Sequence, residues 1–227
     1  MRRELDHEIQ LAKDQILILG SMVEQAIYQS VKALKDNDTE ASQAILEGDR
    51  LINYRRYEIE TSIIVAIATQ QPIAHDLRLL TALLSLCTEL ERMGDYAKGI
   101  AVINLRSGSL GLPKLLNDLF HMQEKAVDML HRAMTACIHE DKEAAYCIAR
   151  EDELIDALYE QVYYEAIDLT LEDARNIERV NYVLWAAHNL ERFADRVTNV
   201  CERTVFIATG ELVELPLREF DYPPPAH

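Results

Sequence analysis

The amino-acid sequence predicts an all-α protein made of two tandem three-helix bundles that are related by an internal repeat. Glycine and proline are rare, at seven and six of 227 residues, and no proline lies between Pro113 and Pro216. Long stretches are therefore free of residues that break a helix. Aromatic side chains make up only 7% of the chain, and runs typical of β-strands are missing. Amphipathic helices joined by short turns are the expected architecture.

The first bundle is expected over residues 1–107. Apolar residues recur there near the 3.6-residue period of an amphipathic helix, with helices over about 2–35, 39–69 and 72–105. Asp38 or Thr39 is the expected N-cap of the second helix. Gln70-Gln71-Pro72 should stop that helix, and Pro72 should lie near the first turn of the third.

The second bundle is expected over residues 114–210. The segment 107–113 holds two glycines, two serines and a proline, so it is the predicted boundary between the bundles. Beyond it we expect helices over about 114–139 and 143–171, a break near 172–174, and a last helix that ends at Gly210 as a C-cap. The tail, 211–227, contains Pro223-Pro224-Pro225 and is expected to be extended or disordered.

Composition limits the function classes. With 49% hydrophobic residues, the chain can bury one large core or two cores of about 100 residues each. Its net charge of −16 disfavours nucleic acid and anionic lipid as direct partners. No stretch reaches the ~18 uncharged residues of a membrane span, so a cytoplasmic protein is expected. The four cysteines lack CxxC spacing and are interpreted as small buried groups, namely Cys87, Cys137, Cys147 and Cys201.

A repeated motif is the most informative feature. Leu90-Glu91-Arg92-Met93-Gly94-Asp95 reappears as Leu190-Glu191-Arg192-Phe193-Ala194-Asp195. Residues four apart lie on one face of a helix, and two carboxylates there repel each other unless a cation or a donor lies between them. A second pair of stretches, 48–53 and 151–156, places Asp49 and Asp152 in matching contexts, followed four residues later by Asn53 and Asp156. Neighbouring helices could thus gather several carboxylates in each half.

Chance alone would give about seven acidic pairs at this spacing, so repetition is what makes these pairs informative. The apolar positions around them keep the same phase in both halves, at Leu84/Leu184, Leu90/Leu190, Met93/Phe193 and Ile100/Val200. Two interpretations stay open at this point. The carboxylates bind metal ions, or Arg92 and Arg192 neutralise them in structural salt bridges.

Several motifs together resemble the PhoU family of bacterial phosphate-signalling regulators, over about residues 3 to 215. They are the Leu-Glu-Arg-x-x-Asp motif in both halves, Gly48-Asp49-x-x-Ile52-Asn53, Gln71-Pro72-Ile73-Ala74-His75-Asp76-Leu77-Arg78 and Ala208-Thr209-Gly210-Glu211. The resemblance implies a pair of three-helix bundles that can hold iron or zinc clusters, manganese or magnesium. The implied ligands here are Asp49, Glu91, Asp95, Asp152, Asp156, Glu191 and Asp195. Asn53 departs from an acid, and Gly99 stands where the second half has Asn199, so the first site has fewer ligands.

The resemblance also implies a regulatory function. PhoU-like proteins act in the cytoplasm between the phosphate ABC transporter, chiefly its ATPase subunit, and a membrane sensor histidine kinase. They damp phosphate uptake and Pho-regulon expression when phosphate is plentiful, often as homodimers, and reach the membrane only through these partners. The residues agree in kind, since the chain offers no catalytic nucleophile and no glycine-rich phosphate loop. We therefore predict a negative regulator that is not an enzyme.

Two alternatives remain. Carboxylate pairs in helical bundles also build di-metal enzymes, which generally supply Glu-x-x-His on two core helices. Glu4-Leu5-Asp6-His7 fits that pattern but has no counterpart in the second half, and His188 is a better candidate ligand because it lies one turn before Arg192. In the other alternative, the acidic faces carry no metal and only dock a basic partner.

Overall fold

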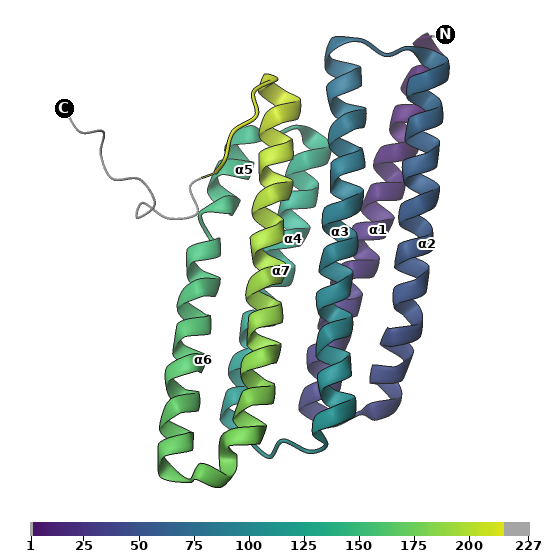
Figure 1. Cartoon of the computed structure of the whole chain (residues 1–227). Coiled ribbons are helices and arrows are strands. Elements are labelled where there is room, and N and C mark those ends of the chain that lie inside the picture. The colour runs from purple at the N-terminus through teal and green to yellow at the C-terminus, as the bar shows by residue number, and fades with distance from the viewer. Residues whose placement is uncertain (1, 216–227) are drawn as a thin grey trace, which may run out of the picture.

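The computed structural model describes residues 2–215, and among these no residue lies in a β-strand. The helices are long and nearly parallel or antiparallel to one another (Figure 1). They are α1 (Arg2–Asp36), α2 (Thr39–Gln70), α3 (Ala74–Ser107), α4 (Pro113–His139), α5 (Lys142–Ala149), α6 (Asp152–Glu172), the short 3₁₀ helix η1 (Ala174–Asn176) and α7 (Ile177–Thr209). The all-α prediction is confirmed.

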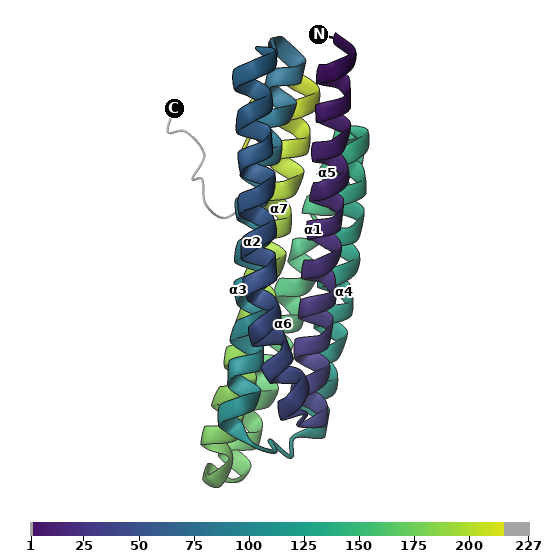
Figure 2. The ribbon, with the colours of Figure 1, turned by 90° about the vertical axis from the view of Figure 1, so that its right-hand side faces the viewer.

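The helices form two three-helix bundles that lie side by side. α1, α2 and α3 pack together in the first, and α4, α7 and the α5–α6 segment pack together in the second. α2, α3, α7 and α6 stand next to one another in a front layer, with α1 and α4 behind them (Figures 1 and 2). The bundles are joined along α3 and α7 and along α1 and α4. Because the buried side chains of both bundles form one continuous cluster, the chain has a single core.

Local chemistry explains most helix ends. The Asp38 carboxylate accepts a hydrogen bond from the backbone N–H of Ala41 at 2.9 Å, as expected of an N-cap. Gly210 ends α7 with a φ of 84°, a left-handed conformation that glycine adopts without strain. Pro113 occupies the first turn of α4, where its missing N–H costs no hydrogen bond.

The turn between α1 and α2 is held from a third helix. Asn104 of α3 is completely buried, and its side-chain amide donates to the carbonyl oxygens of Ala33 and Asp38 at 3.1 and 2.9 Å. The same amide donates to the hydroxyl of Ser42 at 2.8 Å. A single buried side chain thus satisfies acceptors on both sides of this turn.

Two element boundaries differ from the prediction. The expected helix over 143–171 is divided into α5 and α6 by a turn at Arg150 and Glu151. There the backbone N–H of Leu154 donates to the carbonyl oxygen of Glu151, three residues earlier, and not four as in an α-helix. α3 begins at Ala74 rather than with Pro72 in its first turn, because Ile73 is extended (φ −126°, ψ 159°). Gln71 and Ala74, which flank Pro72 and Ile73, both have a φ of 49°.

Three of the four cysteines are buried. Cys87, Cys137 and Cys201 are buried as predicted, but Cys147 is exposed on α5. Burial raises the pKa of the Cys87 and Cys201 thiols to about 12. Residues 211–215 form no helix and return to the bundle, since Leu215 is buried and its N–H donates to the Glu202 carboxylate. The predicted disorder around Pro223-Pro224-Pro225 lies outside the described residues.

None of the helices that the structure describes combines the length and apolarity needed to cross a membrane.

Candidate functional site

The predicted ligands fall into two sets, one in each bundle. We call Asp49, Glu91 and Asp95 the first carboxylate set, which α2 and α3 supply, and Asp152, Asp156, Glu191 and Asp195 the second carboxylate set, which α6 and α7 supply. The sets have the same pattern of exposure. Asp49 and Asp152 are buried, at 6% and 5% exposed, while the acids on α3 and α7 are half-buried. The repeated motif therefore places its carboxylates equivalently in both bundles.

A lysine side chain lies inside the first carboxylate set. The ammonium group of Lys98, on α3, is 2.6 Å from Oδ2 of Asp49 on α2. The Asn53 amide also donates to Asp49, to its carbonyl oxygen at 3.0 Å and to Oδ2 at 3.4 Å. The pKa of Lys98 is raised, chiefly by this hydrogen bond to Asp49 and further by the negative charges of Asp95 and Glu91. All three carboxylates of the set therefore act on one ammonium group.

Two arginines complete the neutralisation of the first set. Nη1 of Arg56 lies 3.5 Å from Oε1 of Glu91, and its Nε lies 2.8 Å from Glu60. Arg92 contacts Glu91 at 3.8 Å and Asp95 at 3.5 Å. The interpretation of Arg92 as a salt-bridge partner therefore has direct geometric support.

Two positions that are cationic in the first set are uncharged in the second. In the repeat, Tyr159 replaces Arg56 and Thr198 replaces Lys98. The Thr198 hydroxyl donates to the backbone carbonyl of Asp195 at 2.7 Å and brings no charge. The pKa of Asp195 is raised, first by burial and then by the charge of Asp156, against the opposing effect of nearby cations such as Arg192. The second set therefore lacks counterparts of the Arg56 guanidinium and the Lys98 ammonium.

Glu191 contacts a histidine. Nδ1 of His188, one turn earlier on α7, lies 3.4 Å from Oε2 of Glu191. His188 is exposed, and its ring also packs against Tyr159 with the ring centres 6.3 Å apart. The pKa of the Tyr159 phenol is raised, mainly by burial and also by the charge of Glu191.

Two residues predicted to support the second site lie at the joint between the bundles. The Asn199 amide donates to Oε2 of Glu89 on α3 at 2.9 Å. The guanidinium of Arg192 stands over the ring of Tyr96, also on α3, at 6.0 Å from its centre. Arg196 lies between Arg192 and Asn199 along α7, and its Nη1 is 3.3 Å from Oε2 of Glu89. Asn199 and Arg192 therefore connect α7 to α3.

The two sets differ in how well they suit a metal ion. Within residues 2–215, no three or more histidine, cysteine, aspartate or glutamate side chains are grouped so as to hold an ion. The first set does not fit a metal because the Lys98 ammonium already stands among its carboxylates. In the second set, Asp156 and Asp195 are close enough to raise the pKa of Asp195. A pair of carboxylates suits a hard, hydrated ion that keeps several water ligands, such as Mg²⁺.

The di-metal enzyme alternative finds no support in the histidines. His7 is exposed in the second turn of α1. The exposed ring of His188 forms an ion pair with Glu191. An Fe or Zn cluster needs more ligands than a pair of carboxylates supplies.

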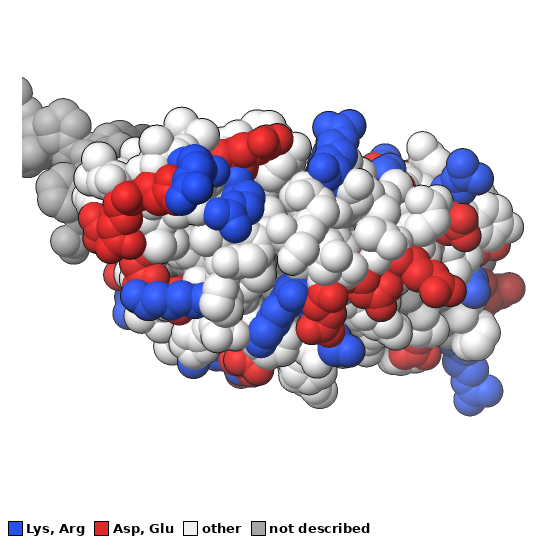
Figure 3. Space-filling view, turned by 90° about the horizontal axis from the view of Figure 1, so that it is seen from below, with Lys and Arg blue, Asp and Glu red and all other residues white. Residues whose placement is uncertain are grey.

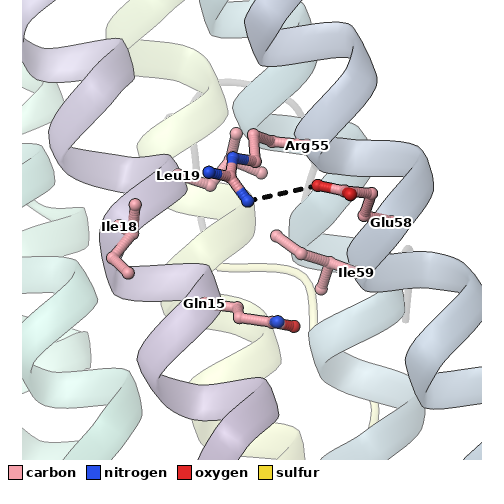
Figure 4. Close-up of a pocket in the computed structure, with 6 residues that line it drawn as sticks. All are labelled: Gln15, Ile18, Leu19, Arg55, Glu58 and Ile59. Carbon is pink, nitrogen blue, oxygen red and sulfur yellow. Dashed lines mark hydrogen bonds and ion pairs between the residues drawn. The ribbon is translucent and has the colours of Figure 1, made fainter.

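Cavities lie on both sides of the first set. A cavity of about 250 Å³ between α1 and α2 includes Asp49 and Gly94 in its wall. An open cavity of about 420 Å³ between α3 and α7 is lined by Asp95, Lys98 and Trp185, among others. A smaller one, of about 60 Å³, contains the Arg55–Glu58 ion pair of 3.2 Å, with Gln15 below it (Figure 4). Of these three cavities, the first two are lined by members of the first carboxylate set and the third is not.

Lys98, Arg56 and Glu89 are the functional candidates that sequence reasoning missed. Lys98 could have been found, because it follows Asp95 by three residues and therefore shares its helix face. Comparing position 98 with position 198 in the repeat would have shown a lysine in one half and a threonine in the other. Arg56 and Glu89 follow no repeated pattern in the sequence.

Surface charge is not uniform over the molecule. At the end where α2 and α7 begin, lysine and arginine side chains are interspersed with acidic ones and with wide uncharged areas (Figure 3). The acidic residues behind the net charge of −16 therefore do not form a single acidic surface at this end. The carboxylate sets are local features of the front layer.

Comparison with known proteins identifies the family. The family model described as PhoU domain matches twice, at residues 16–103 and 119–204. The phosphate-specific transport system accessory protein PhoU homolog of Clostridium acetobutylicum is 31% identical, over 94% of this chain and 98% of that protein. PhoU of Escherichia coli, named in the same way as an accessory protein, is 31% identical over 92% of this chain and 86% of its own length.

Solved structures agree with the sequences. The crystal structure of the phosphate transport system regulatory protein PhoU from Streptococcus pneumoniae superposes with a TM-score of 0.86 at 33% identity, over 93% of this chain and all of that one. PhoU from Pseudomonas aeruginosa gives a TM-score of 0.85 at 28% identity, over 91% of this chain and 99% of that one. These names describe accessory and regulatory proteins, in agreement with the prediction that the chain is not an enzyme. Two domain matches and full-length relatives together show that the chain belongs to the PhoU family.

Proposed function

We propose that the chain is a negative regulator of phosphate uptake and of phosphate-responsive gene expression. It acts in the cytoplasm as an adaptor between the ATPase subunit of a phosphate ABC transporter and a sensor histidine kinase. The observation that carries the proposal is the double PhoU-domain match together with relatives named for phosphate-specific transport. The absence of a ready ligand cage among residues 2–215 favours an adaptor over a metalloenzyme.

The front layer is the proposed partner surface. Both carboxylate sets belong to its four helices, and its two middle helices, α3 and α7, are neighbours. A partner could therefore contact both bundles at once. Since the recognised groups include half-buried acids such as Glu91 and Glu191, binding should favour a basic partner and weaken as salt is added.

A metal ion is proposed only for the second set. Asp156 and Asp195 are the central ligands, with Glu191 and Asp152 beside them on the same two helices. Magnesium or manganese fits this arrangement better than an iron or zinc cluster, because a hydrated hard ion needs few protein ligands. Such an ion would supply positive charge that compensates the paired carboxylates. Asp195→Asn should lower the content of bound metal, as measured by elemental analysis of protein purified without chelator.

A homodimer is proposed as the working assembly. Exposed apolar side chains on α2, such as Leu51, Tyr54 and Ile64, are available for association. Light scattering at several protein concentrations would give the mass directly, and a mass of one chain at every concentration would contradict the dimer.

A genetic experiment tests the regulatory function. Deleting the gene should make phosphate-starvation genes run constitutively in phosphate-rich medium. Replacing Glu91, Asp95, Glu191 and Asp195 together with alanine should reproduce that phenotype, since half-exposed helix positions tolerate alanine.

The matched control carries the same change of charge on other helices. It replaces four exposed acids of α1, α4 and α5, namely Asp14, Asp36, Glu124 and Glu143, with alanine and should repress normally. Helical circular dichroism confirms that both variants are folded. A folded front-layer variant that still represses normally would show that the carboxylate sets are not the working surface.

A further inference from the structure

The first carboxylate set is arranged around a positive charge that the chain itself provides. The side chain of Asp49 is 7% exposed, and one of its oxygens, Oδ2, lies 2.6 Å from the Lys98 ammonium. The other oxygen, Oδ1, is buried and has no hydrogen-bond partner among the described residues. A buried carboxylate with only one oxygen engaged is costly unless a cation stays beside it.

The ammonium of Lys98 is also open to solvent on one side. Its side chain is 40% exposed, and it lines the 420 Å³ cavity between α3 and α7 together with Asp95. Space for a hydrated ion therefore lies next to the group that now carries the charge. Lys98 therefore contacts Asp49 with its ammonium group and also lines this cavity.

The second half provides an internal comparison. Thr198 takes the place of Lys98, at the same distance along the helix from Asp195 as Lys98 is from Asp95. Its hydroxyl donates to the backbone carbonyl of Asp195, so position 198 supplies no ammonium group. The two halves therefore solve the same problem of adjacent carboxylates in different ways.

We infer that Lys98 is a built-in counter-ion that occupies the cation position of the first carboxylate set and excludes metal from it. Metal binding is then confined to the second half, and the chain takes up fewer ions than its two repeated motifs suggest. Removing the ammonium should convert the first set into a metal site, because Asp49, Glu91 and Asp95 would then lose the central charge that all three act on, while Asp95 lines the open cavity. This inference extends the metal-binding part of the proposed function.

The test measures bound Mn²⁺ by electron paramagnetic resonance in the full-length chain at neutral pH, for the wild type and three variants. Lys98→Met keeps the aliphatic stem and removes the charge, so it should bind one Mn²⁺ more than the wild type. Lys98→Arg keeps the charge and should bind the same amount as the wild type. Asp195→Asn should remove the ion of the second half and leave the behaviour of the first unchanged.

The outcomes separate this inference from the proposal for the second set. If the wild type binds no Mn²⁺ but Lys98→Met binds one, the second-set proposal fails and the role of Lys98 stands. If the wild type binds an ion that Asp195→Asn removes, yet a folded Lys98→Met variant gains none, the role of Lys98 is refuted. Binding to the first set in the wild type, seen as an ion that Asp49→Asn removes, would refute it as well.

A second pair of variants covers loss of folding. Lys98→Met leaves the Asp49 carboxylate buried and uncompensated, whereas Asp49→Asn/Lys98→Met removes both charges. Mn²⁺ should raise the melting temperature of the single variant, or restore its helical circular dichroism, more than that of the double variant, in which only the second set can bind the ion. An equal response of the two variants to Mn²⁺, or no response in either, would overturn the inference.

Discussion

Glu89 of α3 accepts hydrogen bonds from two residues of α7, with Oε2 2.9 Å from the Asn199 amide and 3.3 Å from Nη1 of Arg196. The carboxylate is 16% exposed, so this contact links the two bundles where little water competes. Arg196 is also hydrogen-bonded to Tyr96, which raises the pKa of its guanidinium. The joint between the bundles thus combines an apolar core with a compact polar network.

Glu89→Ala is expected to destabilise the whole molecule. The substitution leaves the guanidinium of Arg196 and the amide of Asn199 without their shared acceptor, at a cost of about 1–3 kcal/mol. Urea denaturation followed by circular dichroism measures the loss. Glu89→Gln keeps an acceptor oxygen and should lose less. An alanine variant as stable as the wild type would mean that the contact contributes nothing to the joint.

Asn104→Ala is expected to loosen the turn between α1 and α2. Three acceptors, including the carbonyls of Ala33 and Asp38, lose a buried donor, and the free energy of unfolding should fall by about 2–3 kcal/mol. Ser42→Ala removes only one of the three contacts and is the matched control, with a smaller expected loss. Hydrogen exchange should increase for the amides of residues 37–42. Unchanged exchange there would contradict the proposed role of Asn104.

The ion pair between Arg132 and Glu151 predicts a dependence of stability on pH. The hydrogen bonds that the Arg132 guanidinium donates to the Glu151 carboxylate lower the pKa of Glu151 below its usual 4.5. The pair therefore stabilises the fold above pH 4.5, and its contribution is lost as the pH falls through the folded-state pKa. Since both side chains are more than a third exposed, the effect at neutral pH is about 0.5–1 kcal/mol. Glu151→Gln should cost this much in urea denaturation at neutral pH and nothing well below pH 4.5.

Glu24 provides a control with the opposite sign. Burial raises its pKa above 4.5, against the effect of His131, so its contribution to stability is present below pH 4.5 and is lost as the pH rises through the folded-state pKa. The stability of Glu24→Gln relative to the wild type should therefore improve from acid to neutral pH. Parallel pH profiles for the Glu24 and Glu151 variants would be inconsistent with these assignments.

Gly48→Ala is expected to stabilise the protein. Gly48 is an exposed residue inside α2, and a Cβ built on it meets no heavy atom within 4 Å. Alanine in a helix interior is favoured over glycine by about 0.5–1 kcal/mol, which corresponds to a rise of roughly 1–4 °C in melting temperature. At Gly99 the same Cβ would lie 2.8 Å from Oδ1 of Asn189, so Gly99→Ala should gain less. Equal gains at both positions would argue against close packing at Gly99.

Local sequence predicted the features that depend on one or two turns of helix. Asp38 as an N-cap and Gly210 as a C-cap follow from the chemistry of helix ends. The break at Arg150 and Glu151 could not be predicted, because neither residue disfavours a helix. There the guanidinium of Arg132, on α4, donates a hydrogen bond to the Glu151 carboxylate, a contact with a residue outside the segment 143–171.

The candidate site was predictable to a similar extent. Spacing along the chain placed Glu91 with Asp95 and Glu191 with Asp195 on single helix faces. It could not show that the Lys98 ammonium reaches across to Asp49, because that contact depends on how α2 and α3 lie against each other. The same limit applies to Asn199, whose partner Glu89 is 110 residues away in the sequence.

The two bundles meet through equivalent helices. The contacts between them pair the first helix of one repeat with the first of the other, α1 with α4, and the third with the third, α3 with α7. Equivalent surfaces that meet in this way are the hallmark of an isologous, two-fold interface. The molecule therefore has the geometry of a homodimer whose two subunits have become one chain. A separate copy of either repeat would leave one side of the shared core open to water, and its natural cover would be a second copy of itself.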